Sequence, residues 1–310
     1  MRRGAPLKIL FFACVLAMAV TAAPARAGDV IVVDGKHAVR KDDPFVPARS
    51  AIALRPAPAR TGAAAVASAA GGPRAYAARP KRGPRAVARA LKRERSRRHI
   101  SARTYRRYTR DYRRARKVLR RLRGARKTQL AYVVASVERL ALSRRLTRTR
   151  LPASFLQLRR NTQYWPSLPY PAVGQQVTFT GSEILFQYFP GEGLQIHPLS
   201  TFKKANLIHG ACTRGEPTCD EDALRRLLDE MTSLAVRRSR HFIAWEYLFY
   251  FGGGYPPWIS GMAEATAIQA YGRAADLLNE PSYRKTAERA LPVFRTPPPT
   301  GVRTTGPNGG

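Results

Sequence analysis

Apolar residues recur at helical spacing in two basic stretches of the first half of the chain. The stretches are SARTYRRYTRDYRRARKVLRRL and KTQLAYVVASVERLALSRRL, with Gly124 between them. They predict a basic helical hairpin over residues 99–150. Residues 28–98 show a short DVIVVDG opening and then mostly Ala, Gly, Pro and Arg. Because such a segment has little large apolar surface to bury, we predict that it is disordered.

From Leu151 onward the pattern predicts a body of helices with a small antiparallel sheet. A short helix precedes QVTFTGSEILFQYFPGEGLQIHPLSTF, where apolar residues alternate with polar ones between turn residues. A helix over about 220–240 follows, and FIAWEYLFYFGGGY predicts a strand bounded by glycines. Ser260 is a good N-cap for the next helix. That helix carries Met262, Ala263, Thr266, Ala267, Ala270 and Ala274, and small residues on its buried face predict close packing against other helices. Pro281 opens a final helix. The expected inward residues of that final helix are Tyr283, Ala287, Leu291 and Phe294.

The net charge of +35 is concentrated in the first half of the chain. Residues 1–150 hold 39 Lys and Arg against 7 Asp and Glu, whereas residues 151–310 hold 16 against 13. A basic segment of this kind can bind the phosphates of nucleic acid. For an exported protein, however, the expected partner is an acidic polysaccharide, an anionic envelope polymer or a membrane surface. The alternative is that the charge is only solvated.

The N-terminus has the features of an export signal. Arg2, Arg3 and Lys8 flank or precede the apolar run ILFFACVLAMAV, and ARA ends at Ala27. The run is short for a membrane span of about 20 residues. We therefore predict a signal peptide over 1–27 and a secreted or envelope-associated protein, the alternative being an uncleaved anchor.

Two cysteines remain outside this predicted signal. Cys212 and Cys219 lie in ACTRGEPTCDED and can close a small loop in an oxidising compartment, the alternative being two free thiols. A metal site needs more ligands, and only His209 lies close in the sequence. We expect no metal and no cofactor.

Several longer motifs resemble one enzyme family. FQYFPGEGLQIHPLSTFKKAN, FIAWEYLFYFGGGYPPWISGMAEATA, GRAADLLNEPSYRKTAERALPVF and TGV resemble the C-terminal region of D-glucuronyl C5-epimerases in order and spacing. Those enzymes invert C5 of glucuronic acid units in heparan-type and related polysaccharides. The resemblance covers about 151–303, and PPWISGMA with Arg273 is its most specific element.

The resemblance also carries an expectation for the fold. It implies an incomplete (α/α) toroid of paired helices, preceded by a β-rich region that lines the substrate cleft. The expected fold class is therefore mainly α with a small antiparallel β-sheet. Residues 304–310 are expected to form a disordered tail.

The loop FGGGYPPW before Ser260 is the first candidate site. Glycines permit unusual backbone angles and Pro256 and Pro257 restrict theirs, so the loop is stiff. Tyr255 and Trp258 offer flat apolar faces with a polar edge, which suits a sugar ring. The helix N-terminus, with a partial charge of about +0.5, favours a uronate carboxylate. The alternative is that Trp258 only covers the core.

The hairpin end YFPGEGLQIHPL is the second candidate site. His197 could act as an acid or base near neutral pH, or could serve only as a structural hydrogen-bonding group. The candidate catalytic residues are Tyr188, His197 and Tyr255. The full predicted substrate-binding set is Tyr188, Glu192, Gln195, His197, Asn206, Tyr255, Trp258, Ser260 and Arg273. Glu183 and Glu246 are weaker candidates.

Two features of the sequence depart from the family pattern. The resemblance implies that tyrosines and a glutamate transfer the proton, with the main Tyr/Glu motif after the TGV segment, where this sequence has only RTTGPNGG. We therefore expect little epimerase activity. Glu264 stands where the family usually has glutamine, and Ala265 where many members have glycine. An unpaired negative charge there would repel a uronate.

The predicted function is that of an exported epimerase-like protein that acts on, or binds, a uronate-containing polysaccharide. The alternative is a non-enzymatic binder of anionic envelope glycans. A polysaccharide lyase or hydrolase on a toroid fold is less favoured, because no pair of carboxylates stands out in the sequence.

Overall fold

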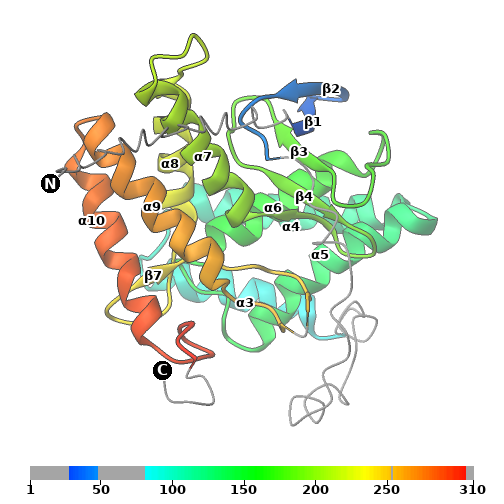
Figure 1. Cartoon of the computed structure of the whole chain (residues 1–310). Coiled ribbons are helices and arrows are strands. Elements are labelled where there is room, and N and C mark those ends of the chain that lie inside the picture. Colours follow the sequence, from blue (N-terminus) through cyan, green and yellow to red (C-terminus); the bar gives the residue numbers. More distant parts are fainter. Residues whose placement is uncertain (1–27, 48–80, 253, 305–310) are drawn as a thin grey trace, which may run out of the picture.

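The computed structural model describes residues 28–47, 81–252 and 254–304 and shows a mainly helical protein with a small sheet (Figure 1). This confirms the predicted balance of helix and strand. The helices in the described ranges are α3 (Gly83–Ser96), α4 (Ala102–Arg121), α5 (Gly124–Leu142), α6 (Leu151–Tyr164), α7 (Pro198–Thr213), α8 (Glu221–Leu234), α9 (Gly261–Leu277), α10 (Pro281–Ala290) and the 3-10 helix η2 (Leu291–Arg295).

The main sheet has five strands in the order β2-β1-β3-β4-β5. The strands are β1 (Gly28–Asp34), β2 (His37–Asp43), β3 (Gln176–Phe179), β4 (Phe186–Phe189) and β5 (Gly193–Ile196). β1 runs parallel to β3, and the other neighbouring strands are antiparallel. The antiparallel β3–β5 part was predicted from the alternation of apolar residues, whereas the pairing of β1 with β3 was not.

The prediction that residues 28–98 are disordered is wrong for the parts that the structure describes. Residues 28–43 form β1 and β2, because the apolar residues of DVIVVDG find a partner strand in β3. Residues 83–96 form α3, which buries a stripe of apolar side chains. That stripe consists of Ala86, Val87, Ala90 and Leu91. Residues 48–80, the predicted signal peptide and most of the predicted tail lie outside the described residues.

Helix α5 is the most buried helix of the N-terminal half. Its middle, TQLAYVVASV, has no charged side chain, and the buried residues lie on every side of it. Helices α3, α4 and α6 pack around it. The prediction of two basic helices over 99–150 is confirmed, but they do not form a separate hairpin. Most of their buried apolar residues belong to one core cluster that extends from Ile31 to Ala290, while Tyr132 of α5 belongs to a smaller cluster with Phe189 and Phe249.

Helices α7, α9 and α10 lie side by side in the C-terminal half (Figure 1). Small residues form much of the buried face of α9, as predicted, since Ala263, Ala267, Ala270 and Ala274 are buried. Met262 is 64% exposed and does not belong to this face. Two of the expected inward positions of the last helix are wrong, since Leu291 and Phe294 are 48% and 38% exposed. The reason is that α10 ends at Ala290 and the chain turns into η2.

The other C-terminal elements are shorter than predicted. The helix expected over 220–240 ends at Leu234, and the expected strand FIAWEYLFYFGGGY reduces to β7 (Ile243–Ala244), which pairs with β6 (Val236–Arg237). Cys212 and Cys219 form a disulfide between α7 and α8, with their Cα atoms 4.5 Å apart. No helix in the described ranges is long and apolar enough to cross a bilayer.

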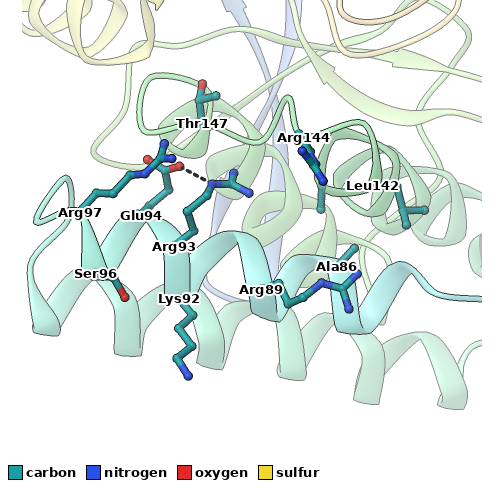
Figure 2. A pocket seen from close by; sticks show the side chains of 11 residues that line it. Ala86, Arg89, Lys92, Arg93, Glu94, Ser96, Arg97, Leu142, Arg144 and Thr147 are labelled. Carbon is teal, nitrogen blue, oxygen red and sulfur yellow. Dashed lines mark hydrogen bonds and ion pairs between the residues drawn. The ribbon is translucent and has the colours of Figure 1, made fainter.

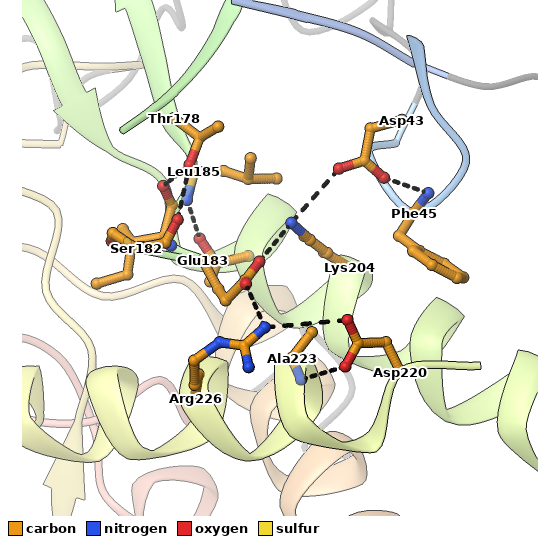
Figure 3. A network of polar contacts seen from close by, with 12 residues as sticks. Asp43, Phe45, Thr178, Ser182, Glu183, Leu185, Lys204, Asp220, Ala223 and Arg226 are labelled. Atoms are coloured by element: carbon orange, nitrogen blue, oxygen red, sulfur yellow. Dashed lines mark hydrogen bonds and ion pairs between the residues drawn. The ribbon is translucent and has the colours of Figure 1, made fainter. Parts of the chain in front are cut away.

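A network of charges joins the N-terminal strand pair to the helices (Figure 3). The buried Lys204 of α7 lies 3.4 Å from a carboxylate oxygen of Asp43 and 2.8 Å from one of Glu183. Arg226 of α8 contacts Glu183 at 3.3 Å and Asp220 at 3.9 Å. The cations therefore separate carboxylates that would otherwise repel each other.

We predict that Lys204→Ala lowers the free energy of unfolding by about 2 kcal/mol, because it leaves Asp43 and Glu183 without their shared cation in a partly buried place. Urea titration of the variant measures this change. Lys203→Ala is the matched control, since Lys203 is exposed. Equal midpoints for the two variants would show that the network does not stabilise the fold.

Candidate functional site

The loop from Trp245 to Trp258 folds back on itself. The backbones of Tyr247 and Trp258 exchange two hydrogen bonds, of 2.8 and 3.1 Å, and their rings stack with centroids 4.3 Å apart. The indole nitrogen of Trp258 donates to the carbonyl of Phe249 at 2.6 Å. We call residues 245–258 the aromatic loop. Its stiffness comes from these contacts as well as from its two prolines, and Trp258 is partly buried.

The aromatic loop packs on the turn between β4 and β5. The ring of Phe189 lies 4.3 Å from that of Phe249 and 5.9 Å from that of Phe251. The ring of His197 lies 5.6 Å from that of Tyr247. The structure therefore brings together the two segments that the sequence analysis singled out separately.

Helix α5 hydrogen-bonds both the β4–β5 turn and the aromatic loop. The side-chain carbonyl of Gln129 accepts from the amide of Gly193 at 3.0 Å, and the hydroxyl of Tyr132 accepts from the amide of Tyr250 at 2.8 Å. The hydroxyl of Ser136 donates to the carbonyl of Leu248 at 2.8 Å. Residues spaced by three and four lie on one face of a helix, so a single face of α5 supports the hairpin turn and the loop.

Glu192 is a buried carboxyl group in the turn between β4 and β5. Burial raises its pKa to about 8, against hydrogen bonds from the Tyr132 hydroxyl and the Tyr250 amide, which favour the charged form. At pH 7 Glu192 is therefore mostly protonated and can donate a proton.

A chain of contacts leads from Glu192 toward the surface. Tyr132 hydrogen-bonds Glu192 and the amide of Tyr250, and the Tyr250 ring lies 5.2 Å from the ring of Tyr255. Tyr255 and Phe251 are 41% and 40% exposed. The rings of Phe251 and Tyr255 thus lie at the surface, and the largely protonated carboxyl group of Glu192 is buried.

Of the two interpretations of His197, the contacts of its ring favour the structural one. Its Nδ1 accepts from the amide of Ser200 at 3.2 Å, so the ring caps α7. Burial lowers its pKa to about 4, with a smaller effect of the nearby Lys203. The imidazole is consequently neutral at pH 7, which favours the structural interpretation.

Tyr188 and Gln195 lie away from the aromatic loop. The Tyr188 ring packs against Trp165 and Tyr170, and burial raises its pKa above the ordinary value. The side-chain oxygen of Gln195 accepts from Gln157 of α6 at 2.7 Å. The structure places these two predicted site residues in the core.

The remaining predicted residues follow α7 and α9. Arg273 donates to the side-chain oxygen of Asn206 at 3.3 Å, and Asn206 donates to the carbonyl of Thr266, so the pair joins α9 to α7. Ser260 caps α9 as predicted, because its hydroxyl accepts from the amide of Ala263. That amide is already bonded and is not free for a uronate.

A buried charge cluster lies behind the loop. Glu246 accepts from Arg150 at 2.7 and 2.8 Å and from Arg238 at 2.6 Å. Glu264 is fully buried beside this cluster, and one of its oxygens accepts from the amide of Trp245 at 2.9 Å. Burial raises the pKa of Glu264 to about 8. The charge that was expected to repel a uronate is therefore buried and largely neutral at pH 7.

No metal-binding group is apparent within the described ranges, where no three His, Cys, Asp or Glu side chains lie close together. Residues missed by the sequence analysis are Gln129, Tyr132 and Ser136. A signal for them exists in their spacing, since polar groups three and four positions apart interrupt an apolar helix.

Comparison with known proteins supports the resemblance of the C-terminal part. Residues 238–307 match the family model described as D-glucuronyl C5-epimerase C-terminus. The match includes all of the aromatic loop, α9 and α10. No curated protein and no solved structure matched the chain.

We predict that Glu264→Gln removes part of the pH dependence of stability. The folded pKa of Glu264 is raised, so the unfolded chain loses its proton first, and the wild type loses about 1.4 kcal/mol per pH unit between about pH 4.5 and 8. Melting temperatures of wild type and variant should diverge over that window, with the variant more stable at high pH. The control is Glu288→Gln, at an exposed site. A constant difference from pH 5 to 9 would contradict the assignment.

Proposed function

We propose that the protein is an exported, epimerase-type protein that binds uronate-containing polysaccharide at the aromatic loop. The match of residues 238–307 to the C-terminal family model carries this proposal. In this proposal the helix pairs of the C-terminal half form part of a toroid, and the protein lies outside the cytoplasm or in the envelope.

The geometry of the loop supports sugar binding. Phe251 and Tyr255 expose flat rings on a loop that is held by backbone hydrogen bonds and by α5. A preorganised aromatic surface loses little conformational entropy when a sugar ring stacks on it. The partly buried ring of Trp258 stacks on the ring of Tyr247 and lies next to the exposed ring of Phe251, so it helps to fix this surface.

The reaction that we propose is exchange of the proton at C5. One group takes the C5 proton next to the carboxylate, and a second returns a proton from the opposite face of the ring. Among the three candidate catalytic residues, Tyr255 alone is exposed, since Tyr188 is in the core and His197 caps a helix. We assign the two roles to Tyr255 and to Glu192, whose protonated carboxyl is the donor at neutral pH.

For binding, we predict that the double variant Phe251→Ala and Tyr255→Ala weakens the affinity for an unsulfated glucuronate polymer about thirtyfold, because each of the two ring contacts contributes about 1 kcal/mol. Isothermal titration calorimetry measures the affinity. The control is Phe294→Ala, which removes an exposed ring on η2. Equal affinities for both variants would place the binding site elsewhere.

For the chemistry, we predict slow deuterium uptake at C5 of the polymer in deuterated water, abolished in Glu192→Gln. Uptake should fall above about pH 8, because Glu192 then loses the proton that it donates. Mass spectrometry of the released uronates measures it. Lys203→Ala serves as the control variant. Uptake that persists unchanged in Glu192→Gln would contradict this role.

The second candidate function is non-enzymatic binding of anionic envelope glycans. The observation that favours it is the excess of exposed arginines on α3 and α4. Polymer binding without any deuterium uptake would identify this function. Unsaturated or shortened products would instead indicate a lyase or a hydrolase.

A further inference from the structure

A basic pocket lies between α3 and the turn that follows α5 (Figure 2). Its volume is about 800 Å³, and it is open to solvent. None of its lining residues falls within the part of the chain that matches the epimerase family model. The charged residues that line it are Arg89, Lys92, Arg93, Glu94, Arg97 and Arg144.

Exposed cations from α3 and from the turn after α5 line the pocket. Arg89 and Lys92 lie three positions apart on α3, Arg97 is the residue that follows its last turn, and all three are exposed. Arg144 comes from the turn after α5 and is also exposed. The positive charge therefore comes from two elements that are about 50 residues apart in sequence.

The one carboxylate of the pocket is already neutralised. Glu94 is buried and lies 3.2 Å from Arg93 and 2.8 Å from Nδ1 of His99. Arg93 also donates to the carbonyl of Leu146. Among the described residues, no ion pair involves Arg89, Lys92, Arg97 or Arg144. These four cations repel one another, and a bound anion would offset that repulsion.

The basic pocket adjoins the aromatic loop. A neighbouring pocket of about 310 Å³ shares Leu142 with it and is also lined by Pro256, the residue after Tyr255. An extended polymer that leaves the exposed rings at Tyr255 therefore meets the second pocket and then the basic one. A small anion could bind in the basic pocket alone, so the neighbouring pocket that reaches Pro256 favours a long polymer as the ligand.

We propose that the basic pocket binds the acidic groups, carboxylate or sulfate, of the same uronate polysaccharide whose other units lie on the aromatic loop. This inference rests on the proposed function. The pocket holds the polymer outside the reacting unit and raises its affinity and rate of association. It gives the N-terminal helices a role in substrate binding that the family match does not cover.

The test compares two variants that each lose three arginines and one lysine. The pocket variant is Arg89→Gln, Lys92→Gln, Arg97→Gln and Arg144→Gln. The control variant is Arg106→Gln, Arg110→Gln, Arg113→Gln and Lys117→Gln on the exposed face of α4. The probes are an unsulfated glucuronate polymer, heparin and a single-stranded oligonucleotide, each titrated at several salt concentrations.

The pocket variant should bind the two glycans about tenfold more weakly, with a smaller salt dependence, and the control should change less than twofold. Equal losses in both variants would overturn the inference, because binding would then depend on total charge. Wild-type binding that is tighter for the oligonucleotide than for either glycan, and lost in the pocket variant, would identify nucleic acid as the ligand and overturn it too.

The outcomes separate this inference from the proposed function. If the pocket variant binds glycans like the wild type while the Phe251 and Tyr255 variant does not, the pocket has no role and the proposed function stands. If the wild type binds neither glycan, both are wrong. Thermal melting checks that the variants fold, and the single variant Arg97→Gln, with an expected twofold loss, is used if the quadruple variant does not.

Discussion

The burial of helix α5 is the constraint on which the rest of the structure depends. Its uncharged middle can be buried on every side only if the polar groups that it carries find partners. Gln129, Tyr132 and Ser136 find them in the backbone of the β4–β5 turn and of the aromatic loop. The need to satisfy buried polar groups therefore positions the two segments of the candidate site relative to each other.

The same burial determines the chemistry of the site. Removal from water raises the pKa of Glu192 to about 8 and lowers that of His197 to about 4. The carboxyl group of Glu192 thus stays largely protonated at neutral pH, and His197 is a neutral helix cap. Glu264 follows the same rule, because burial keeps its side chain largely uncharged at neutral pH.

Residues 1–150 carry most of the positive charge, but the described helices of this half pack into the same core as the C-terminal half. The arginines of α3 and α4 are mostly on the outer faces, while the apolar faces of these helices join the common core. The exposed cations of α3 line one pocket, and Pro256 of the aromatic loop lines a second pocket that shares Leu142 with it. An extended acidic polymer is the ligand that we propose for these two features.

Local pattern was enough to predict several elements. The alternation in QVTFTGSEILFQYFPGEGLQIHPL predicted β3–β5, the Ser260 cap predicted the start of α9, and the motif around Trp258 indicated the family. These features depend on residues close together in the sequence, so the sequence carries them directly. The prediction of disorder was wrong for the segments that form β1 and α3. Their short apolar stripes are stable only when they pack against partners far along the chain.

The sequence by itself determined the positions of the basic segment, the aromatic loop and the small-residue face of α9. Tertiary structure decided which of the candidate residues share a site. Ser136 and Leu248 are 112 residues apart and are joined by one hydrogen bond, whereas Tyr188 and Glu192 are close in sequence and point into different surroundings. The physical reason is that burial and hydrogen bonding act between neighbours in space, and spacing along a chain specifies such neighbours only within one helix or hairpin.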